Sequence, residues 1–186
     1  MEALFSSFTA VAIAEIGDKT QLLSLFLAAR FRAKGAIIAG ILLATLLNHA
    51  ASAWLGVWVA QLIPANWHYG LLGGSFIAVG LWLLIPDKDD SDDSGVLRYG
   101  AFVASCVLFF LAEMGDKTQV ATVLLAANFE QAVWYVIWGT TLGMLAANVP
   151  VVYAGSWLMQ KIPLALARRA ACAVFISLGL YIIVAG

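Results

Sequence analysis

Two matching clusters of charged residues lie inside apolar stretches of the sequence. Residues 14–21 read AEIGDKTQ and residues 112–119 read AEMGDKTQ, so seven of the eight positions are identical. Each copy supplies two carboxyl groups, one ammonium group, a threonine hydroxyl and a glutamine amide. Ionisable side chains are rare in apolar helices because charge is costly in lipid, and those present usually have a function. The repeat therefore predicts a polar site built from both copies.

The spacing within each copy suggests how the charges are arranged. On a continuous helix the glutamate, aspartate and lysine stand at positions i, i+3 and i+4, which share one face. The two sets are Glu15, Asp18 and Lys19, and Glu113, Asp116 and Lys117. If the sets meet, four carboxylates and two ammonium groups share one cavity with a net charge of −2. That charge suits a divalent cation, and Ca²⁺, Mg²⁺ and Mn²⁺ all prefer oxygen ligands.

The same cluster could also exchange protons. Closely spaced carboxylates in a low dielectric cannot all remain ionised without counter-charge, so we expect some of them to bind protons. Lys19 and Lys117 cannot ligate a cation, and we interpret them as charge compensators. A site that accepts either protons or a divalent cation is what an antiporter requires. The alternative, salt bridges that only hold helices together, is less favoured because membrane helices usually pack through small residues.

Several uncharged side chains are further candidate ligands. They lie within the motifs or inside other apolar runs: Thr20, Thr118, Gln21, Gln119, Asn48 and Asn148. For the two asparagines, an interhelical hydrogen bond is an equally good interpretation. His49 is better explained as a packing residue than as a proton relay. Gly17 and Gly115 could let each helix unwind locally and expose backbone carbonyls.

The elements that position these groups are expected to be membrane helices. Of 186 residues, 63% are hydrophobic and 11% are charged, so the chain could not cover itself with a polar surface and belongs in a lipid bilayer. The apolar runs are continuous, which favours helices over the alternating strands of a barrel. We expect an all-α protein with six transmembrane helices at residues 3–29, 36–63, 70–85, 99–127, 132–159 and 166–185.

The similarity between the two halves extends beyond the charged motifs. At an offset of 99 residues, three glycines of the first half recur in the second: Gly40 and Gly139, Gly56 and Gly155, Gly80 and Gly179. This pattern predicts two three-helix repeats, residues 1–86 and 99–186, joined by an acidic cytoplasmic linker at residues 87–98. Because three is odd, the second repeat must have inverted topology, with the site expected at the repeat interface near the midplane.

The positive charges predict the orientation in the membrane. With six spans, one face holds every lysine and arginine outside the motifs: Arg30, Arg32, Lys34, Lys88, Arg98, Lys161, Arg168 and Arg169. By the positive-inside rule this face is cytoplasmic, so both termini lie outside. No basic patch suggests binding to nucleic acid. We expect a monomer or homodimer whose substrates are a divalent cation and protons, with no cofactor beyond the transported cation.

The two Glu-x-Gly-Asp-Lys-Thr motifs, at residues 15–20 and 113–118, resemble those of a known family. It is the family of small cation/proton exchangers that includes bacterial manganese exporters and the Golgi calcium/manganese–proton antiporters of eukaryotes. The resemblance implies Mn²⁺ or Ca²⁺ as cargo, protons as counter-ion, and the acidic residues of both motifs as the cation site. The short chain looks like the bacterial branch, which implies export of Mn²⁺ across the inner membrane.

Other classes of function remain open at this point. A cation channel or uniporter would use similar acidic rings, and an exporter of a small organic solute such as an amino acid could share the helix count. An enzyme is not expected, because no histidine–carboxylate metal signature or nucleophile accompanies the motifs. The sequence also has no nucleotide-binding glycine-lysine loop, so ion gradients should drive transport by alternating access, as the halves rock about the site.

Overall fold

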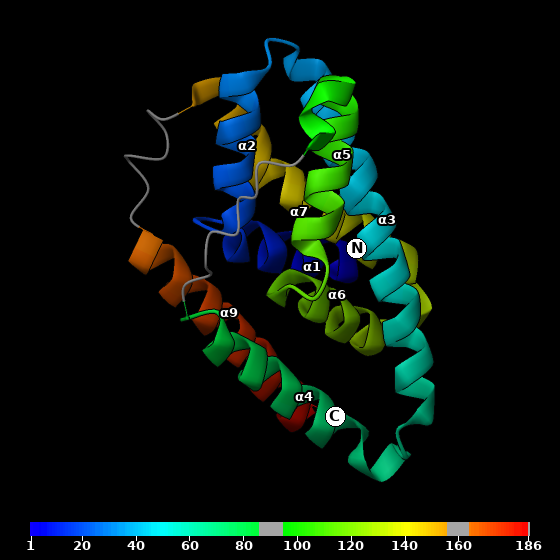
Figure 1. Cartoon of the computed structure of the whole chain (residues 1–186). Coiled ribbons are helices and arrows are strands. Elements are labelled where there is room, and N and C mark those ends of the chain that lie inside the picture. The colour runs from blue at the N-terminus through cyan, green and yellow to red at the C-terminus, as the bar shows by residue number, and fades with distance from the viewer. Residues whose placement is uncertain (86–94, 156–163, 186) are drawn as a thin grey trace.

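All secondary structure in the described part of the chain is helical (Figure 1). The computed structural model describes residues 1–85, 95–155 and 164–185. Helices are the expected outcome for long apolar runs, because a helix satisfies its own backbone hydrogen bonds where lipid cannot. The elements in chain order are α1 (Glu2–Ala14), α2 (Lys19–Arg30), α3 (Lys34–Leu62), α4 (Ala65–Trp82), η1 (Gly95–Tyr99), α5 (Gly100–Glu113), α6 (Lys117–Asn128), η2 (Glu130–Ala132), α7 (Val133–Ala154) and α9 (Leu164–Ala185).

Four helical segments within the described residues are long and apolar enough to cross a membrane. They are Lys34–Leu62, Gly95–Glu113, Glu130–Ala154 and Ala165–Ala185. α1 is a shorter apolar helix of 13 residues. Large apolar side chains such as Trp58 and Leu47 are exposed, as a surface covered by lipid requires. The helical membrane class is therefore confirmed, and the count of six spans stays a prediction.

Two of the predicted spans are each broken at the charged motif. α1 ends at Ala14 and α2 begins at Lys19, while α5 ends at Glu113 and α6 begins at Lys117. In Figure 1 the two parts of each broken segment run in clearly different directions. The expectation that the charged residues of a motif share one face of a continuous helix is therefore wrong, because the helix stops between the glutamate and the lysine.

Other boundaries differ from the expectation in smaller ways. α4 begins at Ala65, before the predicted start at residue 70, directly after Pro64 (φ −58°). Gly155, with φ 60°, ends α7, and residues 156–159 of the predicted fifth span lie outside the described residues. Residues 87–94 of the predicted acidic linker also lie outside them, and the last part of the linker belongs to η1.

Glycines set the closest contacts between helices. A Cβ atom added to Gly40 of α3 would lie 2.6 Å from the carbonyl oxygen of Phe102 in α5. A Cβ atom added to Gly139 of α7 would lie 2.6 Å from the carbonyl oxygen of Leu4 in α1. Both distances are shorter than real Cβ atoms allow, so only glycine permits these helices to approach this closely.

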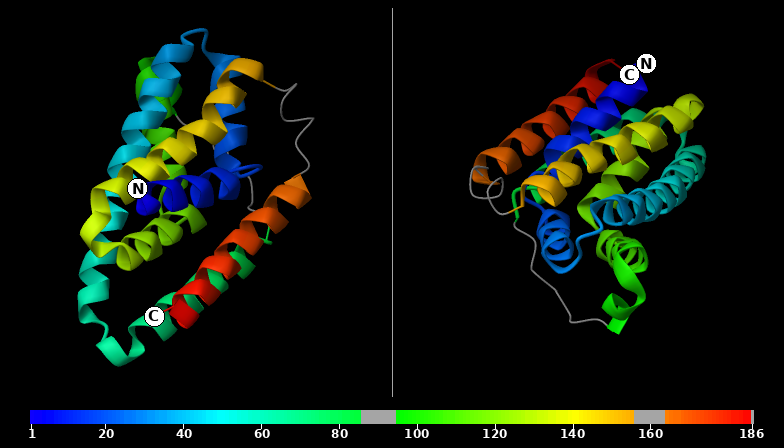
Figure 2. Two further views of the ribbon diagram at one scale, coloured as in Figure 1. Left: turned by 180° about the vertical axis from the view of Figure 1, so that it is seen from behind. Right: turned by 90° about the horizontal axis from the view of Figure 1, so that it is seen from above.

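α4 and α9 form a closely packed pair at one side of the molecule (Figure 2). A Cβ atom on Gly73 of α4 would lie 2.5 Å from the carbonyl oxygen of Gly179 in α9. The rings of Phe76 and Phe175 pack against each other with their centroids 6.0 Å apart, and both side chains are buried. The broken helices α1/α2 and α5/α6, together with α3 and α7, make up the remainder and hold the charged motifs.

Candidate metal site

Each broken helix reconnects through a tight turn centred on the motif glycine. In the second motif the backbone N–H of Asp116 donates to the carbonyl oxygen of Glu113 at 3.1 Å. Met114 has φ −64° and ψ 119°, and Gly115 has φ 75°. This is the geometry of a type II β-turn, which favours glycine at its third position because φ is positive there. Gly17, with φ 84°, has the same place in the first motif.

The glutamine of each motif stabilises this turn. The Oε1 atom of Gln21 accepts a hydrogen bond from the backbone N–H of Gly17 at 2.8 Å. The Oε1 atom of Gln119 accepts the equivalent bond from Gly115 at 2.6 Å. Where a helix is interrupted, such N–H groups lose their helical acceptors and need others. Both amide oxygens are therefore engaged by the turns, and a ligand role for the glutamines stays a prediction.

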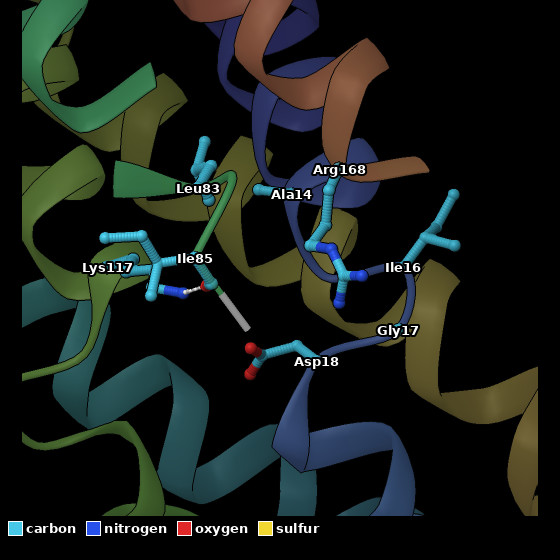
Figure 3. A pocket seen from close by; sticks show the side chains of 8 residues that line it. All are labelled: Ala14, Ile16, Gly17, Asp18, Leu83, Ile85, Lys117 and Arg168. Atoms are coloured by element: carbon cyan, nitrogen blue, oxygen red, sulfur yellow. Dashed lines mark hydrogen bonds between the residues drawn. The ribbon is translucent and has the colours of Figure 1, made fainter. Parts of the chain in front are cut away.

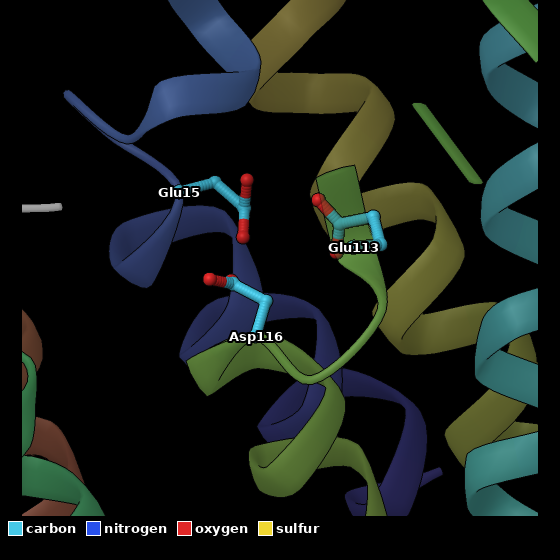
Figure 4. Close-up of side chains that lie close together, drawn as sticks. All are labelled: Glu15, Glu113 and Asp116. Atoms are coloured by element: carbon cyan, nitrogen blue, oxygen red, sulfur yellow. The ribbon is translucent and has the colours of Figure 1, made fainter. Parts of the chain in front are cut away.

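Three carboxyl groups from the two motifs lie close together (Figure 4). Glu15, Glu113 and Asp116 each offer an oxygen atom within 4.8 Å of the others. Their exposed fractions are 0%, 0% and 5%. Hard cations bind oxygens at about 2.0 to 2.6 Å, so ligands on opposite sides of one ion lie about 4 to 5 Å apart. The spacing of the three groups fits a single divalent cation.

The two glutamates of this cluster have different surroundings. Glu15 accepts a hydrogen bond from the hydroxyl of Thr20 at 2.7 Å, and its other oxygen accepts a short one from the hydroxyl of Thr118. Glu15 is thus held by a threonine from each motif. Among the described residues, neither oxygen of the Glu113 side chain has a hydrogen-bond partner. Buried polar groups in proteins nearly always have hydrogen-bond partners, so an unpartnered carboxyl group calls for an explanation such as a functional role.

The lysines occupy two different places. The Nζ atom of Lys19 lies 2.9 Å from a carboxylate oxygen of Asp116, so the first motif supplies a counter-charge to the second. Lys117 is buried and donates to the carbonyl oxygen of Ile85, beyond the end of α4, at 2.5 Å (Figure 3). Three carboxylates and the Lys19 ammonium give the cluster a formal charge of −2.

Asp18 is not a member of the three-carboxylate cluster. It lines a neighbouring pocket together with Lys117 and Arg168 (Figure 3). Asp18 therefore lies outside the spacing that joins the other three carboxyl groups, and a ligand role for Asp18 stays a prediction. Arg168 was not among the candidates from the sequence, and its only signal there was a position near the start of an apolar run.

The two candidate asparagines make hydrogen bonds between helices. The Nδ2 atom of Asn48 in α3 donates to the carbonyl oxygen of Phe110 in α5 at 3.1 Å. The Oδ1 atom of Asn148 in α7 accepts from the hydroxyl of Ser24 in α2 at 2.8 Å. Packing through polar groups accounts for both residues, and direct ligation stays a prediction. His49 is fully buried, and neither ring nitrogen has a hydrogen-bond partner among the described residues.

Comparison with known proteins places this chain in a family. Residues 3–91 and 101–186 match the family described as "Divalent cation/proton antiporter GDT1". The chain belongs to the GDT1 family. It is therefore an integral membrane protein of a transporter family, and the family suggested by the two motifs is confirmed. Both matched segments contain one copy of the motif.

Individual relatives are similar over most of the chain. A Vibrio cholerae protein named "Putative manganese exporter" is 52% identical over 180 residues, covering 97% of this chain and 90% of the relative. The rice "GDT1-like protein 4" (Oryza sativa subsp. indica) is 30% identical, covering 87% of this chain and 66% of the relative. A GDT1-like protein of Synechocystis is 27% identical, covering 86% of this chain and 87% of the relative. No solved structure matches the chain.

Proposed function

We propose that this GDT1-family protein exports a divalent cation across the bacterial inner membrane in exchange for protons. Mn²⁺ is the favoured cargo, and Ca²⁺ is the alternative. The observation that carries the proposal is the buried cluster of Glu15, Glu113 and Asp116, with Lys19 paired to Asp116. Its oxygen ligands suit a hard divalent cation, and its formal charge of −2 balances one. The 52% identical relative named as a manganese exporter supports Mn²⁺ as the cargo.

Proton coupling follows from the same charge balance. Unpaired charge in a dry site of low dielectric costs several kcal/mol, so the cluster must be neutralised whether or not the cation is bound. One divalent cation or two protons would neutralise a formal charge of −2. We therefore expect exchange of two protons for each cation, with no net charge moved across the membrane.

Alternating access requires two repeats that can exchange their roles. Two equivalent contacts support this: Gly40 packs on Phe102 of α5, and Gly139 packs on Leu4 of α1. The two glycines are equivalent at an offset of 99 residues, and Leu4 and Phe102 are equivalent at an offset of 98. Phe76 packs against Phe175, its equivalent at an offset of 99, as expected for residues at a pseudo-two-fold axis.

We infer from this that α1/α2, α3 and α4 form one membrane repeat. The second repeat consists of α5/α6, α7 and α9, and its topology is inverted.

One pair of equivalent contacts differs between these repeats. A Cβ atom on Gly56 of α3 would overlap the backbone of Val123 in α6. Among the described residues, the equivalent position, Gly155 at the end of α7, has only the side chain of Leu25 in α2, at 4.0 Å from such an atom. Hence α3 is packed tightly on α6, while α7 is less tightly packed on α2. In a rocking mechanism the alternate state exchanges these two packing arrangements.

The orientation is proposed from the positive charges. Arg30 and Lys34 flank the connection between α2 and α3, and Arg98 lies in η1 just before α5. Figure 1 places this connection and η1 at the same end of the molecule. Arg168 and Arg169 lie near the start of α9, whereas Lys88 and Lys161 are outside the described residues. We assign the face with these charges to the cytoplasm, with both termini outside.

The test is transport in proteoliposomes that contain a metal-sensitive dye and a pH-sensitive dye. We expect Mn²⁺ uptake with proton counterflow in the wild type, and loss of both in Glu15→Gln and Glu113→Gln. Glu2→Gln, which removes an exposed glutamate outside the motifs, is the matched control and should transport normally. Metal flux without protons would indicate a channel or uniporter. No metal flux from correctly inserted protein would favour an exporter of organic solutes.

A further inference from the structure

We propose that the pocket beside the first motif is the cytoplasmic mouth of the cation pathway, and that Arg168 sets the electrostatic barrier at this mouth. The inference rests on the proposed function, because it assigns the route by which the cation reaches the carboxylate cluster. It assigns Arg168 a role that neither the motifs nor the family match indicates.

The pocket lies directly against the first motif (Figure 3). Its lining includes Ile16 and Asp18 of the motif turn, Ile85 beyond the end of α4, Lys117 at the start of α6 and Arg168 near the start of α9. The same turn that presents Asp18 to the pocket presents Glu15 to the buried cluster (Figures 3 and 4). A cation in the pocket is therefore separated from the proposed ligands only by the β-turn of the first motif.

The position of Arg168 identifies the membrane face to which the pocket belongs. Arg168 lies near the start of α9 and is one of the positive charges that we assigned above to the cytoplasmic face. Ile85 lies just before the predicted cytoplasmic linker. α4 and α9 therefore approach the pocket with their proposed cytoplasmic ends, while α1 and α6 meet it at the motif breaks, so the pocket would connect the cluster to the cytoplasm.

The charges lining the pocket are unfavourable for a cation unless Arg168 moves or is compensated. The ionisable groups of its described lining are the Asp18 carboxylate, the Lys117 ammonium and the Arg168 guanidinium, a formal charge of +1. Figure 3 shows the Arg168 side chain extending from α9 toward the motif turn. A single positive charge at a narrow mouth repels cations and attracts anions. An arginine side chain is long and flexible enough to give way when a divalent cation is drawn toward the cluster.

Comparison with the neighbouring Arg169 distinguishes a role at the pocket from the role of any positive residue at a cytoplasmic helix end. Positive residues at a cytoplasmic helix end are expected from membrane topology alone, and both arginines satisfy that rule. Arg168 is partly buried and lines the pocket, whereas Arg169 is exposed and is not part of the lining. The two positions carry the same charge, one residue apart, and form a matched pair for an experiment.

The experiment measures access to the pocket without relying on transport. In a background with Cys106→Ala and Cys172→Ala, which removes both native cysteines, Ile16→Cys places a thiol on the lining. Two membrane-impermeant thiol reagents of similar size, one cationic and one anionic, are applied to inverted and right-side-out vesicles. We expect labelling only in inverted vesicles. Arg168→Gln should raise the ratio of cationic to anionic labelling rates roughly fivefold, as removal of a nearby unit charge does.

Controls make each outcome decisive. Arg169→Gln should leave the ratio close to that of the background protein, and Arg168→Lys, which keeps the charge, should do the same. Labelling from the outer face, no labelling from either face, or an equal change in Arg168→Gln and Arg169→Gln would each overturn the inference. The assay reports only access, so failure of the proposed exchange would be seen separately, as absence of Mn²⁺/H⁺ exchange by the wild type.

Discussion

Whatever exchange remains in Glu113→Gln should respond to the membrane potential, whereas the proposed exchange by the wild type is electroneutral. In the wild type, Glu15, Glu113 and Asp116 with Lys19 carry a formal charge of −2, matched by one divalent cation or two protons. The substitution leaves −1, which a single proton neutralises. Each exchange of one cation for one proton then moves one net positive charge. Because one charge across 100 mV is worth about 2.3 kcal/mol, the equilibrium Mn²⁺ gradient should shift about 50-fold.

The assay uses proteoliposomes in which potassium and valinomycin set the potential while internal Mn²⁺ is recorded at a fixed pH gradient. We expect the final Mn²⁺ gradient of the wild type to be independent of the potential. Any residual exchange by Glu113→Gln should follow the potential with a slope of one charge. The Glu2→Gln control should behave as the wild type. A wild-type gradient that changes about 50-fold with 100 mV would refute the charge count and the assignment of these four groups to one site.

Three further predictions concern the scaffold of the site. Gly115→Ala should lower stability by about 1 to 2 kcal/mol, because φ 75° is strained for alanine although no atom of the described residues blocks its Cβ. Thermal unfolding in detergent measures this loss. Gly74→Ala, at a helical position that is equally open among the described residues, is the control and should not be destabilised. Gly40→Ala should cost about 1 to 3 kcal/mol in the same measurement, since its Cβ would lie 2.6 Å from a backbone oxygen of α5; an unchanged unfolding temperature would contradict this packing. Gln119→Leu should lower stability by about 0.5 to 1.5 kcal/mol, because the exposed Gly115 N–H loses its acceptor, whereas Gln119→Glu keeps an acceptor and should retain more stability. Equal losses in both variants would argue against that hydrogen bond.

The sequence predicted the family and the clustered acidic residues better than the geometry that holds them. The duplicated Glu-x-Gly-Asp-Lys-Thr motif was enough to indicate a membrane transporter family and to name Glu15, Glu113 and Asp116, which the fold brings together. Helical periodicity was a poor guide at the motifs themselves, because it assumes a continuous helix. The positive φ of Gly17 and Gly115 interrupts each helix between its glutamate and its lysine.

Some roles depend on contacts that no local pattern encodes. That Lys19 pairs with Asp116 of the other motif, and that Lys117 binds the carbonyl oxygen of Ile85, is set by how the two halves pack. The glutamines were predicted as ligands from their oxygen atoms, which stays a prediction. That these oxygens also hold the turns follows from the break in each helix, which leaves N–H groups in need of acceptors. Arg168 could not have been distinguished from Arg169 without the pocket.

The most direct test of a shared cation site is calorimetric titration of Mn²⁺ into the purified protein, in buffers with different enthalpies of ionisation. One Mn²⁺ should bind per chain and release two protons, and Glu15→Gln and Glu113→Gln should each weaken binding at least roughly tenfold through loss of a carboxylate ligand. Glu2→Gln should bind as the wild type does. Binding that releases no protons, or that is unchanged in both motif variants, would contradict a single site built by the two motifs.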